Sequence, residues 1–322
     1  MKNIRGAIVI AFILITNLCA TPVMYAGYFR PGGVEQHIAD TVGEPRKKSA
    51  VIDGWSAPEL ISKQFSFTEG PAADAKGNVY FTDQPNDKIW RYSIDGKLSV
   101  FLDKAGRSNG LYFDKKGNLV ACADEQNQLW SISPAGKVKI LMSSYNGHRL
   151  NGPNDLWIHP SGGIYFTDPY YQRDYWDRKE KELDGEYVYY LPVGKNVAVP
   201  VAKDIVKPNG IIGTPDGRFL YVADIGDNKT YRYTINKDGT LSDRKLFVNQ
   251  GSDGMTIDDK GNIYLTGQGV TVYNPEGIKI EHIPIAESWT ANVCFGGKAF
   301  NYLFITASTA LYKVKMKVHE AR

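Results

Sequence analysis

Short apolar runs alternate with polar, glycine-containing turns along the chain from about residue 57 onwards. Six of these runs share one shape, in which a glycine turn leads into an apolar run that ends at or near an aspartate. They span residues 77–83, 117–124, 162–168, 217–224, 261–267 and, in a degenerate form, 300–307. Short runs of this kind, bounded by Gly, Asn, Asp and Pro, are typical of β-strands.

The spacing of the six runs predicts the fold. Their starts lie 40, 45, 55, 44 and 39 residues apart, and this period is close to that of propeller blades, each of which is a four-stranded sheet. The second repeat shows the pattern best, with strands expected over 109–114, 118–123, 128–132 and 137–141. We therefore predict an all-β, six-bladed β-propeller that occupies residues 57–322.

The last repeat contains only three strand-like runs. The segment 59–67 precedes the first repeat and is well placed to supply the missing outer strand. Pairing the first segment with the last blade would close the ring and leave few exposed sheet edges. We therefore expect this segment to be a strand of the sixth blade.

One position in the repeat always holds an oxygen-bearing side chain. It lies eight residues before each repeat start, and its occupants, called the ring residues below, are Glu69, Asn109, Asn154, Asn209, Asp253 and Asn292. Equivalent positions at the start of the innermost strands surround the central channel of a propeller, so these side chains should converge at one end of it. Asn and Asp also favour turns for local reasons, but Glu does not, and all six repeats conform. The pattern favours a binding site.

The composition of the ring indicates the kind of ligand. Two carboxylates and several amide oxygens, with no Cys or His in the same positions, form a hard-oxygen set. Calcium takes six to eight such ligands and tolerates neutral donors, whereas magnesium requires stricter octahedral geometry. A cation held by only a few side chains would keep positions open for water and substrate, as a Lewis-acid hydrolase requires.

Several motifs, taken in order, resemble the senescence-marker-protein/gluconolactonase (regucalcin-like) family over about residues 57–316. The motifs are Thr68-Glu69-Gly70-Pro71, Leu150-Asn151-Gly152-Pro153-Asn154-Asp155 followed by Tyr165-Phe166-Thr167-Asp168-Pro169, Pro208-Asn209-Gly210, Asp253-Gly254-Met255 and Asn292-Val293-Cys294-Phe295-Gly296-Gly297. The resemblance implies a metal-dependent lactonase, a carboxylic ester hydrolase whose divalent cofactor is most simply Ca²⁺ and whose substrate is a sugar lactone.

The resemblance also implies roles for individual residues. Metal ligands are expected at Glu69, Asn154, Asn209 and Asp253, with Asn154 contacting substrate as an alternative. Asp253 matches the residue proposed as the base that activates water, although a nearby cation lowers the pKa of a carboxylate and weakens it as a base. For the two remaining ring residues, Asn109 and Asn292, substrate contact is inferred from their position in the repeat alone.

Two other functions remain open from the sequence. A phosphotriesterase-like hydrolase would use a similar ion and a similar ring. A non-enzymatic propeller would bind a carbohydrate or protein ligand and hold the ion for structural reasons. A panel of substrates would separate these classes.

Other candidate groups have weaker support. Ser108 lies in a Gly-x-Ser-x-Gly pattern, but a nucleophile elbow is followed by a helix and here a strand follows. His148 and His159 lie near the Asn154 motif but outside the repeat position, which favours surface or packing roles over acid–base catalysis. The longest gap between repeats contains four aromatic residues within 170–176 that could form a lid over the site or simply cushion the blades.

The first 26 residues have the pattern of a secretory signal peptide. Lys2 and Arg5 precede an apolar run over 7–15, and small residues follow at Ala20 and Ala26. An uncleaved membrane anchor is the alternative, but the run is shorter than the roughly 20 residues of a spanning helix. We predict a signal peptide over 1–26, an N-terminal extension over 27–56 and a secreted or periplasmic protein.

Removal of this leader would change the charge and the cysteine count. The formal net charge of +3 would fall to +1 with the loss of two basic residues, so electrostatics favour neither nucleic acid nor membrane as a partner. Cys122 and Cys294 would remain, each inside an apolar run. We expect buried thiols, with a single disulfide as the alternative.

Overall fold

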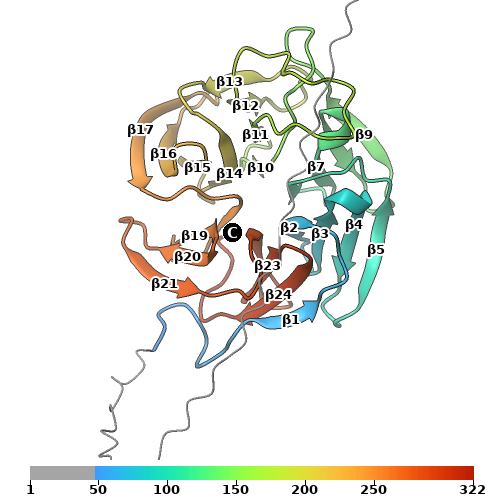
Figure 1. Ribbon diagram of the computed structural model, residues 1–322. Coiled ribbons are helices and arrows are strands. Elements are labelled where there is room, and N and C mark those ends of the chain that lie inside the picture. Colours follow the sequence, from blue (N-terminus) through green and yellow to red (C-terminus); the bar gives the residue numbers. More distant parts are fainter. Residues whose placement is uncertain (1–47) are drawn as a thin grey trace, which may run out of the picture. The chain divides into compact units, whose positions relative to one another are not determined.

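A computed structural model of the chain describes residues 48–322. Within that range, strands form six four-stranded antiparallel sheets, which are arranged as blades around a central channel (Figure 1). This part of the chain is an all-β, six-bladed β-propeller, as the repeat predicted. The expected signal peptide and residues 27–47 of the expected extension lie outside the described residues.

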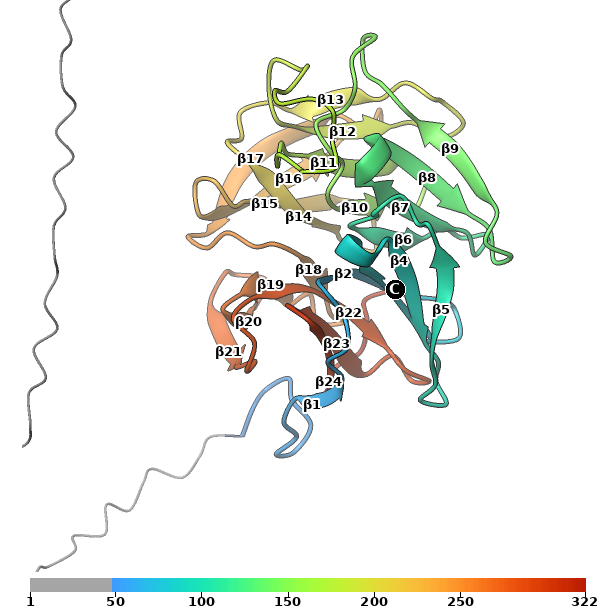
Figure 2. The same cartoon turned by 45° about the vertical axis from the view of Figure 1, so that its right-hand side comes forward.

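Each blade contributes one strand to each of four concentric positions, and the innermost strands surround the channel (Figure 2). The innermost strands of blades one to six are β2 (Thr68–Ala73), β6 (Leu111–Phe113), β10 (Leu156–Ile158), β14 (Pro208–Gly213), β18 (Met255–Ile257) and β22 (Thr290–Gly296). The second strands are β3 (Val79–Asp83), β7 (Leu119–Ala123), β11 (Ile164–Asp168), β15 (Phe219–Asp224), β19 (Ile263–Gly267) and β23 (Tyr302–Ala307).

The two outer positions complete the blades. The third strands are β4 (Lys88–Tyr92), β8 (Gln128–Ile132), β12 (Tyr187–Leu191), β16 (Lys229–Ile235), β20 (Gly269–Tyr273) and β24 (Ala310–Lys315). The outermost strands are β5 (Leu98–Asp103), β9 (Val138–Met142), β13 (Val199–Ala202), β17 (Leu241–Val248), β21 (Lys279–Ile283) and β1 (Glu59–Ser62). Two short 3₁₀ turns, η1 (Gln84–Asn86) and η2 (Asp124–Gln126), follow β3 and β7.

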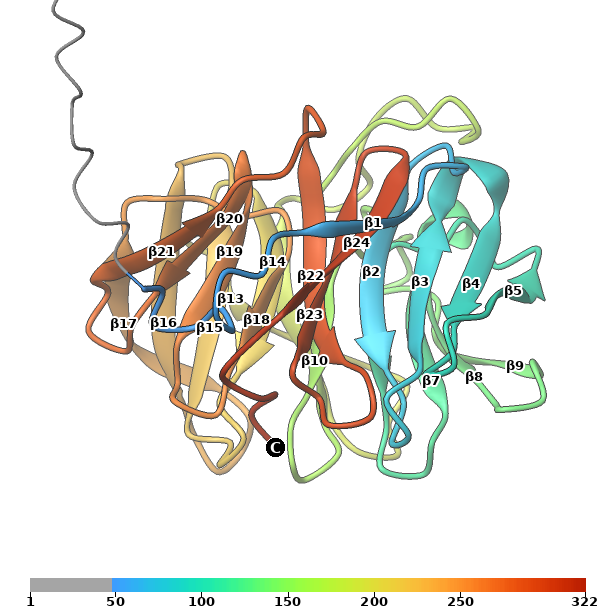
Figure 3. The same ribbon diagram turned by 90° about the horizontal axis from the view of Figure 1, so that it is seen from below.

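Strand β1 closes the ring. It pairs with β24 in antiparallel register, with Glu59 opposite Lys313 and Leu60 opposite Tyr312, and the two strands lie side by side in Figure 3. This confirms the predicted closure. The strand ends at Ser62 rather than continuing to residue 67, because the following segment leaves the sheet to reach β2 and bonds Thr309 on the way (Phe65 N to Thr309 O, 3.3 Å).

The hydrophobic core lies between adjacent blades rather than inside any one of them. One cluster joins Tyr165 of blade three, Val222 of blade four and Leu265 of blade five, all of them buried. The second strands are buried along their whole length in blades one, two and three. A strand with blades packed on both of its faces needs apolar residues at successive positions, which explains the continuous apolar runs in the sequence.

The aspartates that end the second strands hold the chain just before the innermost strands. The carboxylate of Asp83 accepts hydrogen bonds from the backbone of residues 66 and 67. Asp168 does the same for residues 151 and 152, and Asp224 for residues 206 and 207. The recurring Asp of the sequence repeat therefore fixes the segments from which the ring residues project.

Both cysteines of the propeller are free and buried, which confirms the prediction of thiols. Burial raises the pKa of the Cys122 and Cys294 thiols well above the usual value, so both are held in the unreactive, protonated form. Among residues 48–322, no helix has the length and apolar character that crossing a membrane requires.

Candidate active site

The six ring residues meet at one end of the channel, each beside the next blade. Glu69 of blade one interacts with the charge of Asp253 and with the side chain of Asn292. Asp253 in turn receives a hydrogen bond from Asn209. Around the other half of the ring, the backbone N–H of Gly110 donates to the carbonyl of Asn154 at 2.7 Å. The repeat position identified in the sequence therefore does converge in space.

Glycine follows four of the ring residues because neighbouring innermost strands approach closely there. A Cβ atom at Gly70 would overlap the carbonyl oxygen of Asn109, and one at Gly254 would overlap the side-chain amide of Asn292. Gly110 and Gly210 are similarly crowded by residues of the next blade. The polar–glycine pairs in the sequence are therefore a consequence of strand crowding at the channel.

Two carboxylates share the buried centre of the ring. Glu69 is 3 % exposed, and burial together with the charge of Asp253 raises its pKa well above the usual value. Burial raises the pKa of Asp253 to about 6, although hydrogen bonds from Trp289 and Asn209 favour its charged form. Two acidic groups that both resist ionisation in one place are stabilised by a cation between them.

The amides of the ring also indicate a cation site. Among the described residues, the buried side-chain oxygens of Asn109 and Asn209 have no hydrogen-bond partner. The nitrogen of Asn209 donates to the Tyr171 hydroxyl at 3.1 Å, while its oxygen has no partner within residues 48–322. An unpartnered buried oxygen costs roughly 1–3 kcal/mol, and a bound cation would satisfy it.

The donor set therefore fits a hard divalent cation. Within residues 48–322 no group of three or more His, Cys, Asp or Glu side chains is placed to hold a metal ion. Amide oxygens are not counted among those groups, and here they provide two of the four proposed ligands. The carboxylates of Glu69 and Asp253 with the amides of Asn154 and Asn209 form the set that the sequence analysis named.

A long connection covers one side of the ring. Residues 169–186, called the blade-three loop below, join β11 to β12, where blade one uses only residues 84–87. Its aromatic residues reach two other blades, because the Tyr175 hydroxyl donates to the carboxylate of Asp124 in blade two and the Tyr171 hydroxyl contacts Asn209 in blade four. The aromatic cluster noted in the sequence thus lies beside the ring.

The repeat pattern could not identify three residues of the site. Trp289 lies in the connection before β22 and donates from Nε1 to Asp253 Oδ2 at 2.6 Å. Arg173 lies in the blade-three loop, and its charge acts on both Glu69 and Asp253. Asp155 replaces the glycine that follows four other ring residues, and Asn292 donates to it at 3.4 Å. That replacement is a sequence feature that could have drawn attention to Asp155.

Residues 67–309 match the family described as the SMP-30/Gluconolactonase/LRE-like region. The chain belongs to this family. It is 28 % identical over 313 residues to a gluconolactonase of Zymomonas mobilis, a match that covers 86 % of this chain and 87 % of that protein.

Solved structures agree with this assignment to the SMP-30/gluconolactonase family. A gluconolactonase of Xanthomonas campestris superposes with a TM-score of 0.76 at 29 % identity, over 82 % of this chain and 91 % of that chain. A calcium-binding regucalcin of Agrobacterium tumefaciens gives a TM-score of 0.68 at 19 % identity, over 83 % and 98 % of the two chains, which shows the shared fold. The relatives support lactone hydrolysis as the reaction class.

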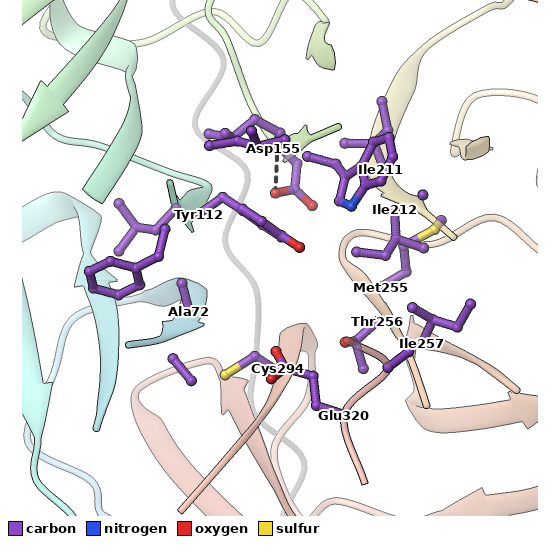
Figure 4. Close-up of a pocket in the computed structure, with 18 of the residues that line it drawn as sticks. Ala72, Tyr112, Asp155, Ile211, Ile212, Met255, Thr256, Ile257, Cys294 and Glu320 are labelled. Carbon is purple, nitrogen blue, oxygen red and sulfur yellow. Dashed lines mark hydrogen bonds between the residues drawn. The ribbon is translucent and has the colours of Figure 1, made fainter. Parts of the chain in front are cut away.

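A cavity of about 380 Å³ lies along the innermost strands beyond the ring of this gluconolactonase-family protein. Tyr112, Asp155, Cys294 and Glu320 point toward it in Figure 4, and the chain ends beside it at Arg322. Asp155 lies between cavity and ring, and burial raises its pKa to about 7. Asp155 therefore lies where the ring meets a cavity whose lining combines Tyr112, Thr256 and Glu320 with many apolar side chains.

The weaker candidates of the sequence analysis have structural roles here. The Ser108 hydroxyl donates to the carbonyl of Ala105 at 2.6 Å, and the next element is strand β6 rather than a helix. His159 packs edge-on against Trp157 and bonds Ser161 and Gly217. His148 lies on an exposed turn. None of the three belongs to the ring.

Proposed function

We propose that this protein is a metal-dependent hydrolase of sugar lactones, with Ca²⁺ as the cofactor. The observation that carries the proposal is that the buried Glu69 and the half-buried Asp253 lie together beside amide oxygens that lack partners. The gluconolactonases among its relatives supply the substrate class. The regucalcin of the same fold is described as calcium-binding, and hard oxygen donors suit that ion.

Some ring residues would bind the cation, and the others would bind the substrate. Glu69, Asn154, Asn209 and Asp253 would hold the cation, which when bound supplies a Lewis acid for the lactone carbonyl. Asn109 and Asn292 lie on either side of Glu69 around the ring, where their amides would donate hydrogen bonds to substrate oxygens. Asn154 could also contact substrate. In the reaction, water adds to the carbonyl carbon of the lactone. The ester C–O bond of the lactone then breaks, and the oxygen released from that bond takes up a proton.

Asp253 would accept the proton of the attacking water. Trp289 holds one carboxylate oxygen at 2.6 Å, so the orientation of the group is defined. Because a bound cation lowers the pKa of a neighbouring carboxylate, Asp253 would act as a weak base whose effectiveness comes from position. The Asn amides would stabilise the negative charge that develops on the carbonyl oxygen.

The decisive experiment combines metal analysis with a substrate panel. We expect purified protein to hydrolyse an aldonolactone such as glucono-δ-lactone, to lose this activity on treatment with a chelator and to regain it with calcium. The panel also includes a phosphotriester and a non-hydrolysable sugar. Turnover of the phosphotriester alone would indicate the phosphotriesterase class, and binding without any turnover would indicate a binding propeller.

A single substitution tests the ligand set. Replacing Asn209 with Ala removes one amide oxygen from the ring but leaves the core between the blades intact, so the protein should fold and bind calcium more weakly. Calorimetric titration measures the affinity directly. Unchanged affinity would remove Asn209 from the set.

We propose a secreted or periplasmic location on the basis of the basic and apolar leader over 1–26. Terminal sequencing of the mature protein from the source organism tests this. A chain that keeps Lys2 and Arg5 would contradict it.

A further inference from the structure

Among the described residues, Arg173 of the blade-three loop uses only the Nε atom of its guanidinium group to form a hydrogen bond. Its Nε donates to Asp124 Oδ2 at 3.0 Å, and its side chain is 24 % exposed. The guanidinium carbon lies 5.6 Å from the centre of the Tyr171 ring. Within the described part of the chain, the two terminal Nη atoms have no hydrogen-bond partner, so four N–H donors remain available.

The charge of Arg173 interacts with carboxylates in and beside the ring. Burial is the largest single influence and favours the neutral guanidine, but Asp124, Tyr175 and Glu69 together raise the pKa of Arg173 above its usual value. The positive charge of Arg173 in turn acts on Asp253. The guanidinium of Arg173 lies over Tyr171, whose hydroxyl contacts the ring residue Asn209, so Arg173 lies beside the ring while its partner, Asp124, lies outside it.

The charges around the site indicate the kind of substrate to which the free Nη donors of Arg173 would bind. A divalent cation would balance Glu69 and Asp253, and Asp124 already balances Arg173. With Asp155 also beside the ring, the loaded site would carry no net positive charge, which favours an uncharged substrate with many oxygen acceptors over an anionic one. The fixed planar donors of Arg suit paired oxygens such as neighbouring hydroxyls.

We propose that Arg173 is the specificity-determining residue of this site and that its Nη groups donate hydrogen bonds to the hydroxyl oxygens of a sugar lactone. This inference rests on the proposed lactonase function. A site whose donors bond the hydroxyl groups of a substrate binds an analogue lacking them less well, because those hydrogen bonds are not made. Arg173 would thus separate sugar lactones from alkyl lactones of the same ring size.

The test compares two lactones with the same six-membered ring. Glucono-δ-lactone carries hydroxyl groups and δ-valerolactone carries none. For Arg173→Met we expect kcat/KM for glucono-δ-lactone to fall by about 100-fold, mainly through KM, while kcat/KM for δ-valerolactone stays within about threefold. Arg173→Lys keeps the charge but not the planar donors and should recover only part of the loss.

A matched control separates recognition from loop anchoring. Tyr175→Phe removes another loop contact to Asp124 and leaves Arg173 in place, so any effect should be equal for the two lactones. An equal fall for both lactones in Arg173→Met would make Arg173 a loop anchor only and would overturn the proposal.

A binding measurement decides the question independently of turnover. Calorimetry on the calcium-loaded protein would use 1,5-anhydroglucitol, a stable ring polyol. Binding by the wild type that is lost in Arg173→Met supports the proposal, and equal binding by both proteins overturns it, as does no binding by the wild type. If the wild type hydrolyses no lactone, the proposed function fails while this measurement still decides the role of Arg173.

Discussion

At the scale of single residues, burial has opposite consequences for two kinds of carboxyl group in this propeller. Glu69 is buried and Asp253 is half-buried beside amide oxygens that lack partners, an arrangement that is unfavourable without a cation and favourable with one. The Glu320 side chain is 29 % exposed, pairs with Arg322 and lines the cavity. We propose that the first pair serves binding, and we expect the raised pKa of Glu320 to affect stability.

Asp253→Asn should separate the two roles of Asp253. The substitution keeps the size and one oxygen donor but removes the negative charge, so calcium affinity should fall. With calcium raised until the site is full, we expect kcat to remain about 10²–10⁴-fold below wild type, the typical contribution of a general base. Steady-state kinetics with parallel metal titration measure both effects. Full recovery of kcat would leave Asp253 as a ligand only.

Glu320→Gln should stabilise the protein in a pH-dependent way. Burial raises the pKa of Glu320 above 4.5, the value of the unfolded chain. The carboxyl is therefore protonated without cost at low pH, and stability is lost as pH rises through the folded-state pKa. We expect a higher melting temperature for the variant at about pH 8 and little difference at about pH 4.

An exposed carboxylate provides the control for this prediction. Glu276 lies on an exposed turn after β20, and Glu276→Gln should change the melting temperature little at either pH. A pH-independent effect of Glu320→Gln would show that the Arg322 contact, rather than burial, governs the energetics of Glu320.

At the scale of elements, closure of the propeller depends on how the first strand and the segment after it pack against the last blade. After β1 the chain places Phe65 between blades one and six, where it packs edge-on against Phe81 at 5.1 Å and Trp90 at 5.4 Å. Phe65 is 6 % exposed, and Leu311 of β24 belongs to the same cluster. The closure therefore relies on side-chain packing as well as on the backbone pairing of β1.

Phe65→Ala should lower the free energy of unfolding by about 3–5 kcal/mol, because it leaves a cavity in this cluster. Leu60→Ala is the matched control, since Leu60 lies on β1 with 48 % exposure and should cost less than about 1 kcal/mol. Chemical denaturation measures both values. Equal costs for the two variants would show that backbone pairing alone holds the closure.

At the scale of the whole molecule, the proposed ligands come from blades one, three, four and five. A cation bound by them would tie together blades that are far apart in sequence, and it would bind the folded chain only. Calcium at about 100 times its dissociation constant should therefore stabilise the protein by about 2.7 kcal/mol. Thermal unfolding with and without a chelator measures this effect.

Two variants make that measurement specific. Asn209→Ala should lose most of the calcium-dependent rise in melting temperature, while Glu320→Gln should keep it. A calcium effect that survives in Asn209→Ala and Asp253→Asn alike would place the ion elsewhere on the molecule.

The sequence alone determined the number of blades, the closure and the six ring positions. It could do so because these features repeat: the blades have similar periods, and each ring residue lies eight residues before the start of its repeat. The crowding that requires glycine after Glu69 and Asp253 is likewise a property of the repeat.

Only the tertiary structure decided which residues outside the repeat join the ring. Arg173 and Trp289 lie in connections whose lengths and paths differ between blades, so no periodic pattern reports where their side chains end. Arg173 reaches the site because Asp124 of another blade holds it, and Trp289 because the connection before β22 brings it onto Asp253. Contacts between blades depend on the three-dimensional path of each loop, and the local pattern of residues does not encode that path.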